Sequence, residues 1–263
     1  MSNPRHDSFR KTPFWRRRMG QAHFYASLGL IAVNLVVYLL TEINGVLVGV
    51  LALQPAAVYG EGAWWQLVTY MFVHTNFSHI LYNMVFLAIA GMAVEQRMRS
   101  YEFLTFYLVC GTLSGLVYLL VGSVTGLHLT FLLGSSGAIY ALILAYAVFG
   151  FEGRNLFIPF AFSLVFGAIQ YSGLVIAGAV PLFSLVSLVQ AANVIVVVAV
   201  VFRPEWMRNP FHIVFLFGTL DVISEAINPI GGVSNLTHLA GFVFAFFYLL
   251  IRYRMNAWTV YRS

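Results

Sequence analysis

The sequence predicts an all-α, polytopic membrane protein, and three observations lead to this fold class. The 263 residues are 60% hydrophobic and only 9% charged, with a mean hydropathy of +0.85. A soluble domain is nearer half apolar and a quarter charged. Long apolar runs recur along the chain, and Lys and Arg are confined to the segments between some of them. Because lipid cannot hydrogen-bond open backbone groups, these runs must be helical.

The predicted spans follow one another from residue 24 to residue 251. A span needs roughly 20 predominantly apolar residues to cross a bilayer. The candidates are residues 24–40 (extending toward 43), 79–95, 103–124, 136–151, two spans within 156–202, 212–227 and 236–251. The run 156–202 is too long for one helix, and a Gly178/Pro181 break near its middle suits a pair. The total is about eight transmembrane helices.

The basic residues predict the orientation of these spans. All 14 Lys and Arg lie in the tails or on one set of connections, and the long connection 45–78 has none. Cytoplasmic loops carry such an excess. We therefore expect a basic cytoplasmic tail (1–21), a membrane domain (22–253) and a second cytoplasmic tail (254–263), in the inner membrane of a bacterium. The net charge of +5 then serves orientation and does not indicate nucleic acid. A single cysteine excludes an internal disulfide framework.

A serine lies between glycines at the head of the fourth predicted span. Gly134 and Gly137 leave no side chains on either side of the Ser136 hydroxyl, so that a substrate backbone or a helix can approach closely. Tyr140 lies one turn beyond Ser136, on the same helix face. A serine hydroxyl becomes a good nucleophile only when a base takes its proton. Taken alone, the motif is better explained as an ordinary small-residue packing face.

Two further polar groups enter the membrane from the same predicted side as Ser136. His79 and Asn83 share one helix face at the start of the second span, preceded by His74. Both can donate hydrogen bonds, as an oxyanion hole requires, although they could also be a helix-capping pair. His238 lies near the outer end of the last span, one turn before Gly241, which permits close helix contact.

The combined pattern resembles the rhomboid intramembrane serine proteases. It reads H-x4-H-x3-N, then G-x-S-G-x2-Y, then H-x2-G in a last span. Further matches are Trp64-Trp65 in the first loop and Gly91 with Glu95 at the end of the second span. The resemblance implies a six-helix core, with residues 156–202 as an inserted hairpin outside it. That insertion lengthens the stretch between Ser136 and His238. Because it adds two helices, Ser136 and His238 still enter the membrane from the same side.

The resemblance also implies roles for these residues. Ser136 would be the nucleophile and His238 the general base, a dyad with no acidic third member. The oxyanion donors would be His79, Asn83 and the Ser136 amide. Tyr140 would stack on the His238 ring, and His74 would belong to the hydrogen-bond network of the first loop. No cofactor is implied, and the substrates would be single-pass transmembrane proteins, cut within or next to their membrane helix.

One departure from the family concerns the first loop. The residue after its tryptophans is usually Arg, and this chain has Gln66, so the way the loop is anchored is left open. Glu95 and Glu102 lie at the cytoplasmic boundary and are expected to be ordinary interfacial charges. Asp221 and Glu225 share one face of the 212–227 span and could form a proton relay or sit near its water-filled end.

Other classes of function were weighed against proteolysis. Metal binding by His74, His79 and His238 is conceivable, but the chain has no H-E-x-x-H motif. An inactive relative that binds and escorts transmembrane helices would be expected to lack Ser136 or His238, and both are present. A small-solute transporter is suggested by the number of spans and by Asp221 and Glu225. Against it, no paired broken helices occur in corresponding halves.

Overall fold

The computed structural model describes residues 24–125, 131–153, 155–157, 161, 209–227 and 233–253. Within these ranges the fold is helical, and its only β-type pairing is one isolated bridge. The elements are α1 (Tyr25–Ile43), α2 (Val46–Leu51), α3 (Pro55–Glu61), α4 (Gln66–Thr69), η2 (Tyr70–Phe72), α5 (Phe77–Phe86), η3 (Leu87–Gly91), α6 (Met92–Glu95), α7 (Ser100–Thr125), α8 (Ser136–Val148), α11 (Pro210–Ile227) and α12 (Val233–Tyr253).

The prediction of an all-helical membrane protein is confirmed. Four helical stretches are long and apolar enough to cross a membrane: Tyr25–Ile43, Phe77–Glu95, Ser100–Val124 and Asn235–Tyr253. The second joins α5, η3 and α6 through a π-helical turn at Leu87–Gly91. The predicted spans at 136–151 and 212–227 coincide with the shorter α8 and with α11. The predicted hairpin at 156–202 lies almost entirely outside the described residues, so the count of eight stays a prediction.

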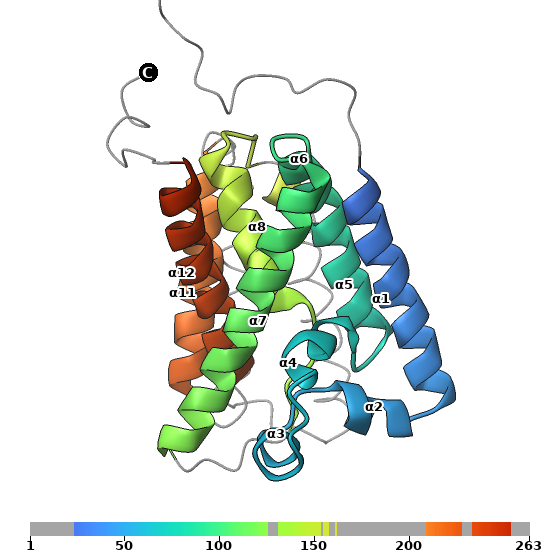
Figure 1. The fold of residues 1–263 in the computed structure, drawn as a ribbon. Helices are drawn as coiled ribbons and strands as arrows, with labels where there is room; N and C mark the ends of the chain where they lie inside the picture. Colours follow the sequence, from blue (N-terminus) through green and yellow to red (C-terminus); the bar gives the residue numbers. More distant parts are fainter. Residues whose placement is uncertain are drawn as a thin grey trace, which may run out of the picture.

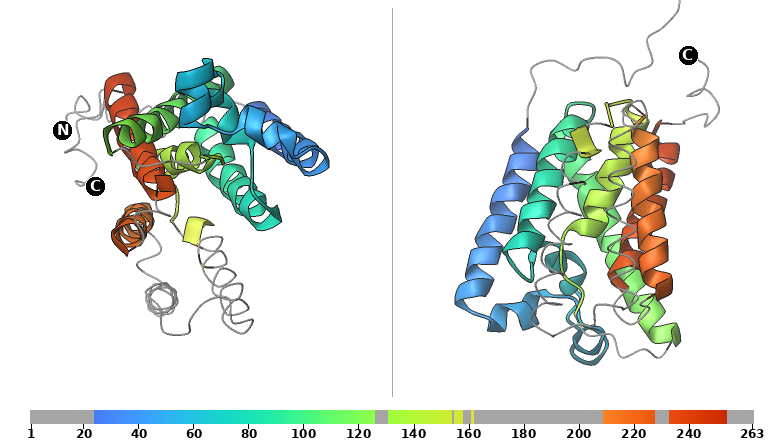
Figure 2. Two further views of the ribbon diagram at one scale, coloured as in Figure 1. Left: turned by 90° about the horizontal axis from the view of Figure 1, so that it is seen from below. Right: turned by 180° about the vertical axis from the view of Figure 1, so that it is seen from behind.

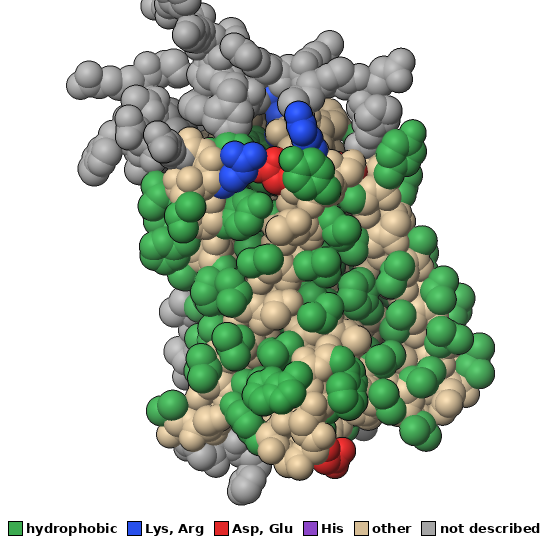
Figure 3. Space-filling model, viewed as in Figure 1, with side chains coloured by type: hydrophobic (Ala, Val, Ile, Leu, Met, Phe, Trp, Pro, Cys, Tyr) green, Lys and Arg blue, Asp and Glu red, His purple; other side chains and the backbone are tan. Residues whose placement is uncertain are grey.

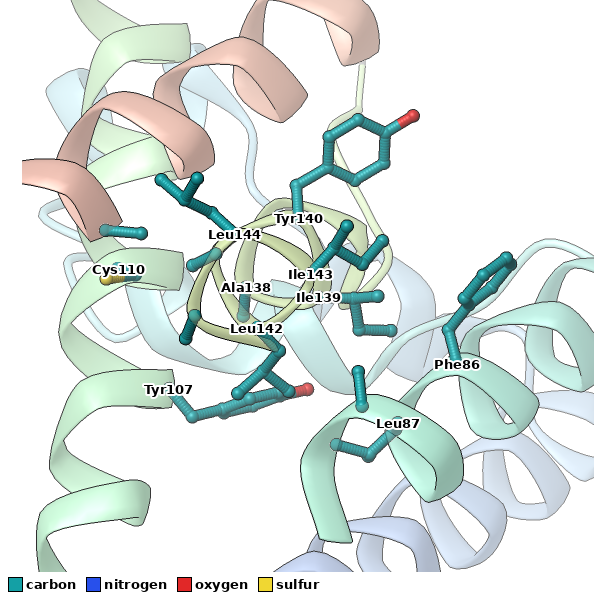
Figure 4. Packing of buried hydrophobic residues seen from close by; sticks show 14 of the residues in the cluster. Phe86, Leu87, Tyr107, Cys110, Ala138, Ile139, Tyr140, Leu142, Ile143 and Leu144 are labelled. Carbon is teal, nitrogen blue, oxygen red and sulfur yellow. The ribbon is translucent and has the colours of Figure 1, made fainter. Parts of the chain in front are cut away.

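Helix α8 is the centre of the bundle. Nearly all of its residues are buried, from Gly137 to Ala147. Figure 4 shows its side chains radiating toward neighbours on several sides, with Tyr107 of α7 below it and Phe86 of α5 beside it. The other helices surround α8 in the view along the bundle (Figure 2). A helix that is apolar all round suits such an enclosed position.

The segment between α1 and α5, which we call loop 1 (residues 44–76), covers one end of the bundle. It contains α2, α3, α4 and η2 and lies at the end opposite the start of α7 (Figure 1). Leu53 of loop 1 and Leu132 exchange two backbone hydrogen bonds of 2.9 Å, which form the isolated bridge. Loop 1 is thereby attached to the strand-like segment that leads into α8.

Two acidic residues at the other end of the bundle are buried, and their interpretation as ordinary interfacial charges is wrong. The Glu95 carboxylate is 3% exposed and accepts the backbone N–H groups of Ala26 and Ser27 and the hydroxyls of Ser27 and Ser100. Those amides lie in the first turn of α1, where no helical carbonyl can satisfy them. Glu95 therefore caps α1 from a distance of nearly 70 residues in sequence.

Glu102 is the second buried acidic residue and lies at the junction of α7 and α12. It accepts a 2.8 Å hydrogen bond from the Tyr253 hydroxyl and pairs with Arg252 at 3.0 Å. The Lys and Arg side chains visible in Figure 3 lie at this same end, and hydrophobic side chains cover most of the rest of the face. This distribution is that of an integral, multi-pass membrane protein.

Candidate active site

The site begins at the turn that leads into α8. Gly134 has a φ of 109°, a region that residues with a Cβ rarely adopt, and its N–H donates to the carbonyl of Tyr70. Ser135 precedes the helix and Ser136 is its first residue. The amides of this first turn have no helical carbonyl ahead of them and present a partial positive charge. Ser136 therefore carries its hydroxyl at a helix end that favours negative charge.

The length of α8 sets the depth of Ser136 in the bundle. Its 13 residues rise only about 20 Å, which is shorter than the roughly 30 Å of a hydrocarbon core. The helix ends level with the end of the bundle where α7 begins (Figure 1). Its first residue therefore lies within the bundle, toward the side covered by loop 1.

The structure brings Ser136 and His238 together from helices far apart in the sequence. The Nε2 atom of His238 lies 2.7 Å from Oγ of Ser136, which is hydrogen-bond distance. Helices α8 and α12 cross closely enough that a side chain at Gly241 would collide with the carbonyl of Gly137. A side chain at Gly137 would in turn meet Ser114 at 3.0 Å. Both glycines are thus required for the short separation of the two functional groups.

Tyr140 supports the imidazole from one face. Its ring stacks on that of His238 with centroids 4.2 Å apart and planes only 16° from parallel. Phe217 of α11 packs edge-on against the same tyrosine at 5.3 Å. Stacking on one side restricts rotation of the His238 ring and holds Nε2 toward the hydroxyl.

His79 lies against the Gly134 turn, whereas Asn83 bonds within its own helix. A side chain at Gly134 would overlap Cε1 and Nε2 of His79 at 2.8 Å and would lie 4.0 Å from Oγ of Ser136. Nδ2 of Asn83 donates to the carbonyl of His79 at 3.0 Å, which uses one of its two N–H groups. The N-cap of α5 is Asn76, so the alternative of a His79/Asn83 capping pair is wrong.

His74 is buried beside His79 without the expected hydrogen bonds. It is 3% exposed, and neither ring nitrogen has a hydrogen-bond partner in the described part of the chain. The two imidazoles meet edge to face, with centroids 4.9 Å apart. Burial, together with the neighbouring His79, lowers the pKa of His74 to about 3, so its ring is neutral at physiological pH. It acts here as an aromatic support.

Tyr70 is a residue that sequence reasoning did not single out. Its hydroxyl donates to the carbonyl of Gly111 at 2.7 Å, and its own carbonyl accepts the N–H of Gly134. Burial raises the pKa of Tyr70, which keeps this hydroxyl protonated and able to donate. A tyrosine in a loop carries no local signal for such a role, since both partners are more than 40 residues away.

Gln66 provides the anchor that was left open for loop 1. Its side chain is 1% exposed, accepts from the N–H of Gln54 and donates to the carbonyls of Gly49 and Val50. Two segments of loop 1, α2 and the start of α3, are thus tied to one side-chain amide. In the lipid-facing environment, backbone groups outside helices must find such partners inside the protein.

The remaining candidates were a metal site and the acidic pair of α11. Among the described residues, no group of three His, Cys, Asp or Glu side chains is arranged to hold a metal ion. Asp221 and Glu225 lie in α11, but their side chains are outside the described part of the structure. What the arrangement offers chemically is a hydroxyl in contact with an imidazole, next to unpaired helix amides and a second imidazole. This set can pass a proton and stabilise a nearby oxyanion.

Comparison with known protein families identifies the fold. A profile described as the rhomboid domain matches residues 61–193, half of the chain. The chain belongs to the rhomboid family. The matched segment includes His79, Asn83 and Ser136 but ends before His238, so the partner of the serine is seen only in the geometry.

Two bacterial rhomboid relatives are similar to this chain. Rhomboid protease GluP of Bacillus subtilis (strain 168) is 28% identical over 136 residues, which are 49% of this chain and 25% of that protein. Putative rhomboid protease YdcA of the same organism is 28% identical over 86 residues, or 33% of this chain and 41% of that protein. The matches thus span less than half the length of each relative.

Proposed function

We propose that this rhomboid protein is an intramembrane serine endopeptidase that uses Ser136 and His238 as a catalytic dyad. The observation that carries the proposal is the 2.7 Å contact between Oγ of Ser136 and Nε2 of His238. The alternative of small-residue packing explains Ser136 by itself. It does not explain why the two groups point at each other beside a stacked tyrosine.

The chemistry follows from the positions of these groups. Nε2 of His238 takes the Ser136 proton as Oγ bonds to the scissile carbonyl carbon, and the carbonyl electrons move to its oxygen. The amide of Ser136, with His79 and Asn83, would stabilise that oxyanion. Collapse breaks the C–N bond, and His238 returns the proton to the leaving amine. Water then releases the acyl group by the same sequence of steps.

The substrates we propose are single-pass membrane proteins, cut within or beside the transmembrane helix. Ser136 lies within the bundle, toward the side that loop 1 covers. A segment that reaches it must leave the helical state locally, because a helix hides its carbonyls in its own hydrogen bonds. Peptides with small or helix-breaking residues at the bond should therefore be favoured.

The test combines active-site labelling with cleavage. The purified protein in detergent is treated with a fluorophosphonate, which reacts with a serine only when a base activates it. Labelling is expected in the wild type and in Ser123→Ala, a matched hydroxyl deletion at the far end of α7. It should be lost in Ser136→Ala and in His238→Ala. Labelling that persists in Ser136→Ala would exclude this dyad.

Cleavage in liposomes separates the protease from its alternative, a non-catalytic rhomboid-like binder or escort. The wild type should cut a reporter that carries one transmembrane helix, and Ser136→Ala should bind the reporter without cutting it. A well-folded wild type that binds but neither labels nor cuts would support the escort. A transporter, a weaker alternative, would instead show solute flux in proteoliposomes that survives Ser136→Ala.

A further inference from the structure

The Nδ1 atom of His79 faces Thr75, the first residue after His74. It lies 3.1 Å from the Thr75 hydroxyl and 3.5 Å from the Thr75 backbone nitrogen. A neutral imidazole has one N–H and one acceptor nitrogen, and the partner of one nitrogen decides the state of the other. A backbone N–H can only donate, so its approach already favours an acceptor at Nδ1.

The direction of the hydroxyl bond is set by the cap of α5. Oδ1 of Asn76 accepts the backbone N–H of His79 at 2.9 Å and the Ser78 hydroxyl at 2.7 Å. Since the cap needs an acceptor, this atom must be the oxygen of the amide, and Nδ2 is the side that faces Thr75 at 3.3 Å. Nδ2 can only donate, so it occupies one of the two lone pairs of the Thr75 hydroxyl. Because the Thr75 backbone N–H already requires an acceptor at Nδ1 of His79, the hydroxyl proton is directed to that nitrogen.

We infer that Thr75 and Asn76 are positioning residues that hold His79 in the tautomer with its proton on Nε2. The relay runs from the Asn76 amide through the Thr75 hydroxyl to Nδ1. The inference rests on the proposed function, in which His79 donates to the oxyanion.

The position of the other ring nitrogen gives this tautomer its use. Nε2 of His79 lies against Gly134, two residues before Ser136. With the proton on Nε2, the ring presents a donor to an oxyanion formed at Ser136. With the proton on Nδ1 it would present a lone pair, which repels that charge. His74 packs on the same ring and limits its rotation.

Three substitutions separate the relay from the cap. Thr75→Val keeps the shape of the side chain and removes the hydroxyl. Asn76→Asp keeps the capping oxygen but cannot donate, so the Thr75 hydroxyl turns toward the carboxylate and Nδ1 of His79 is left to carry the proton. Ser78→Ala removes a hydroxyl that bonds the same Asn76 oxygen without belonging to the relay. It is the matched control.

The first readout is the rate of fluorophosphonate labelling. Thr75→Val should lower it about fivefold and Asn76→Asp about tenfold, below the roughly 100-fold or larger loss when an oxyanion donor is removed outright. Ser78→Ala should label like the wild type, and Thr75→Ser should restore most of the rate. Melting temperatures report whether each variant is folded. Full labelling by both Thr75→Val and Asn76→Asp would overturn the inference.

The second readout is nitrogen NMR of protein labelled with ¹⁵N-histidine, with the His79 signals identified by their loss in His79→Gln. The wild type should show a protonated Nε2, and Asn76→Asp should show the proton shifted toward Nδ1. A wild type protonated on Nδ1 at neutral pH would disprove the relay. This measurement does not require activity. If the wild type fails to label, the proposed dyad is rejected. The tautomer of His79 measured by NMR still shows whether the relay exists.

Discussion

Loop 1 and α11 both contact the region around α8, but they are held by different kinds of interaction. Loop 1 is fixed by side chains that bond main-chain groups: Gln66 to two turns, Thr69 to Leu51, and Tyr70 to Gly111 of α7. The contacts of α11 that the described side chains make are apolar, with Phe217 edge-on against Phe86 and Tyr140. Loop 1 is therefore held in one position, whereas α11 can move more easily.

The cause of the contrast is backbone chemistry. A helix satisfies its own amides, so α11 needs from its neighbours only packing, which is weakly driven in lipid. Irregular backbone at this depth has to find its partners inside the protein. Each of those hydrogen bonds also holds a residue of loop 1 in place. Through the backbone bonds of Tyr70 and Leu53, loop 1 holds the turn before Ser136. The site is therefore rigid because the main-chain groups of loop 1 need hydrogen-bond partners.

The largest effect is expected at Gln66. Gln66→Met conserves volume but removes three part-buried hydrogen bonds to main-chain groups. At about 1 kcal/mol for each, the free energy of unfolding should fall by about 3 kcal/mol. Trp65→Phe is the control, because its indole bond to Val50 is half-exposed and should be worth less than about 1 kcal/mol. Unfolding in mixed micelles measures both. Equal losses would mean that Gln66 is not the anchor.

Two glycines give a matched comparison of the contact with loop 1 and of α11. A Cβ at Gly115 of α7 would meet the Tyr70 ring at 2.8 Å, whereas one at Gly218 of α11 meets nothing closer than 3.8 Å. Gly115→Ala should cost about 2 kcal/mol by overpacking and slow fluorophosphonate labelling, because Tyr70 positions Gly134. Gly218→Ala should be neutral or stabilising by up to about 1 kcal/mol. A similar response at both sites would remove the distinction between loop 1 and α11.

A smaller effect is expected at the aromatic contact of α11. Phe217→Leu removes two edge-to-face contacts and should lower the unfolding free energy by about 1–2 kcal/mol. Because α11 then packs less tightly, cleavage of a transmembrane reporter should be maintained or increased, while Gln66→Met decreases it. Cleavage rates in liposomes, measured below the melting temperature of each variant, provide the check. A Phe217→Leu variant as impaired in cleavage as Gln66→Met would contradict this view of α11.

The smallest effect concerns His74, the polar group of loop 1 that is buried without a bond. Its folded pKa of about 3 lies below the ordinary 6.5, so between these values the unfolded chain binds a proton that the folded protein does not. Stability should therefore fall as the pH falls below 6.5, by about 1 kcal/mol between pH 7 and 5.5. In His74→Phe this part of the acid sensitivity should disappear. Identical pH profiles of unfolding for the two proteins would mean that His74 is not buried as a neutral ring.

Several features of the fold and the site follow from local sequence signals. Apolar runs of sufficient length gave the ends of α1, α7 and α12 to within a few residues. The spacing of Ser136 and Tyr140 placed them on one face of α8, and Gly241 one turn from His238 indicated close packing. Each of these depends on residues within a single helix. Periodicity and hydropathy are sufficient at that range.

The partners of buried polar groups were decided only by the tertiary structure. Glu95 has the sequence context of an interfacial charge, yet it caps α1 because the π-turn and the bundle bring it there. Likewise Tyr70 meets Gly111, and the direction of the Thr75 hydroxyl depends on which atom of Asn76 caps α5. The sequence by itself determined which segments are helical and which residues are able to do chemistry. Only the fold determined which donor meets which acceptor, because a hydrogen bond depends on distances of tenths of an ångström between residues far apart in the chain.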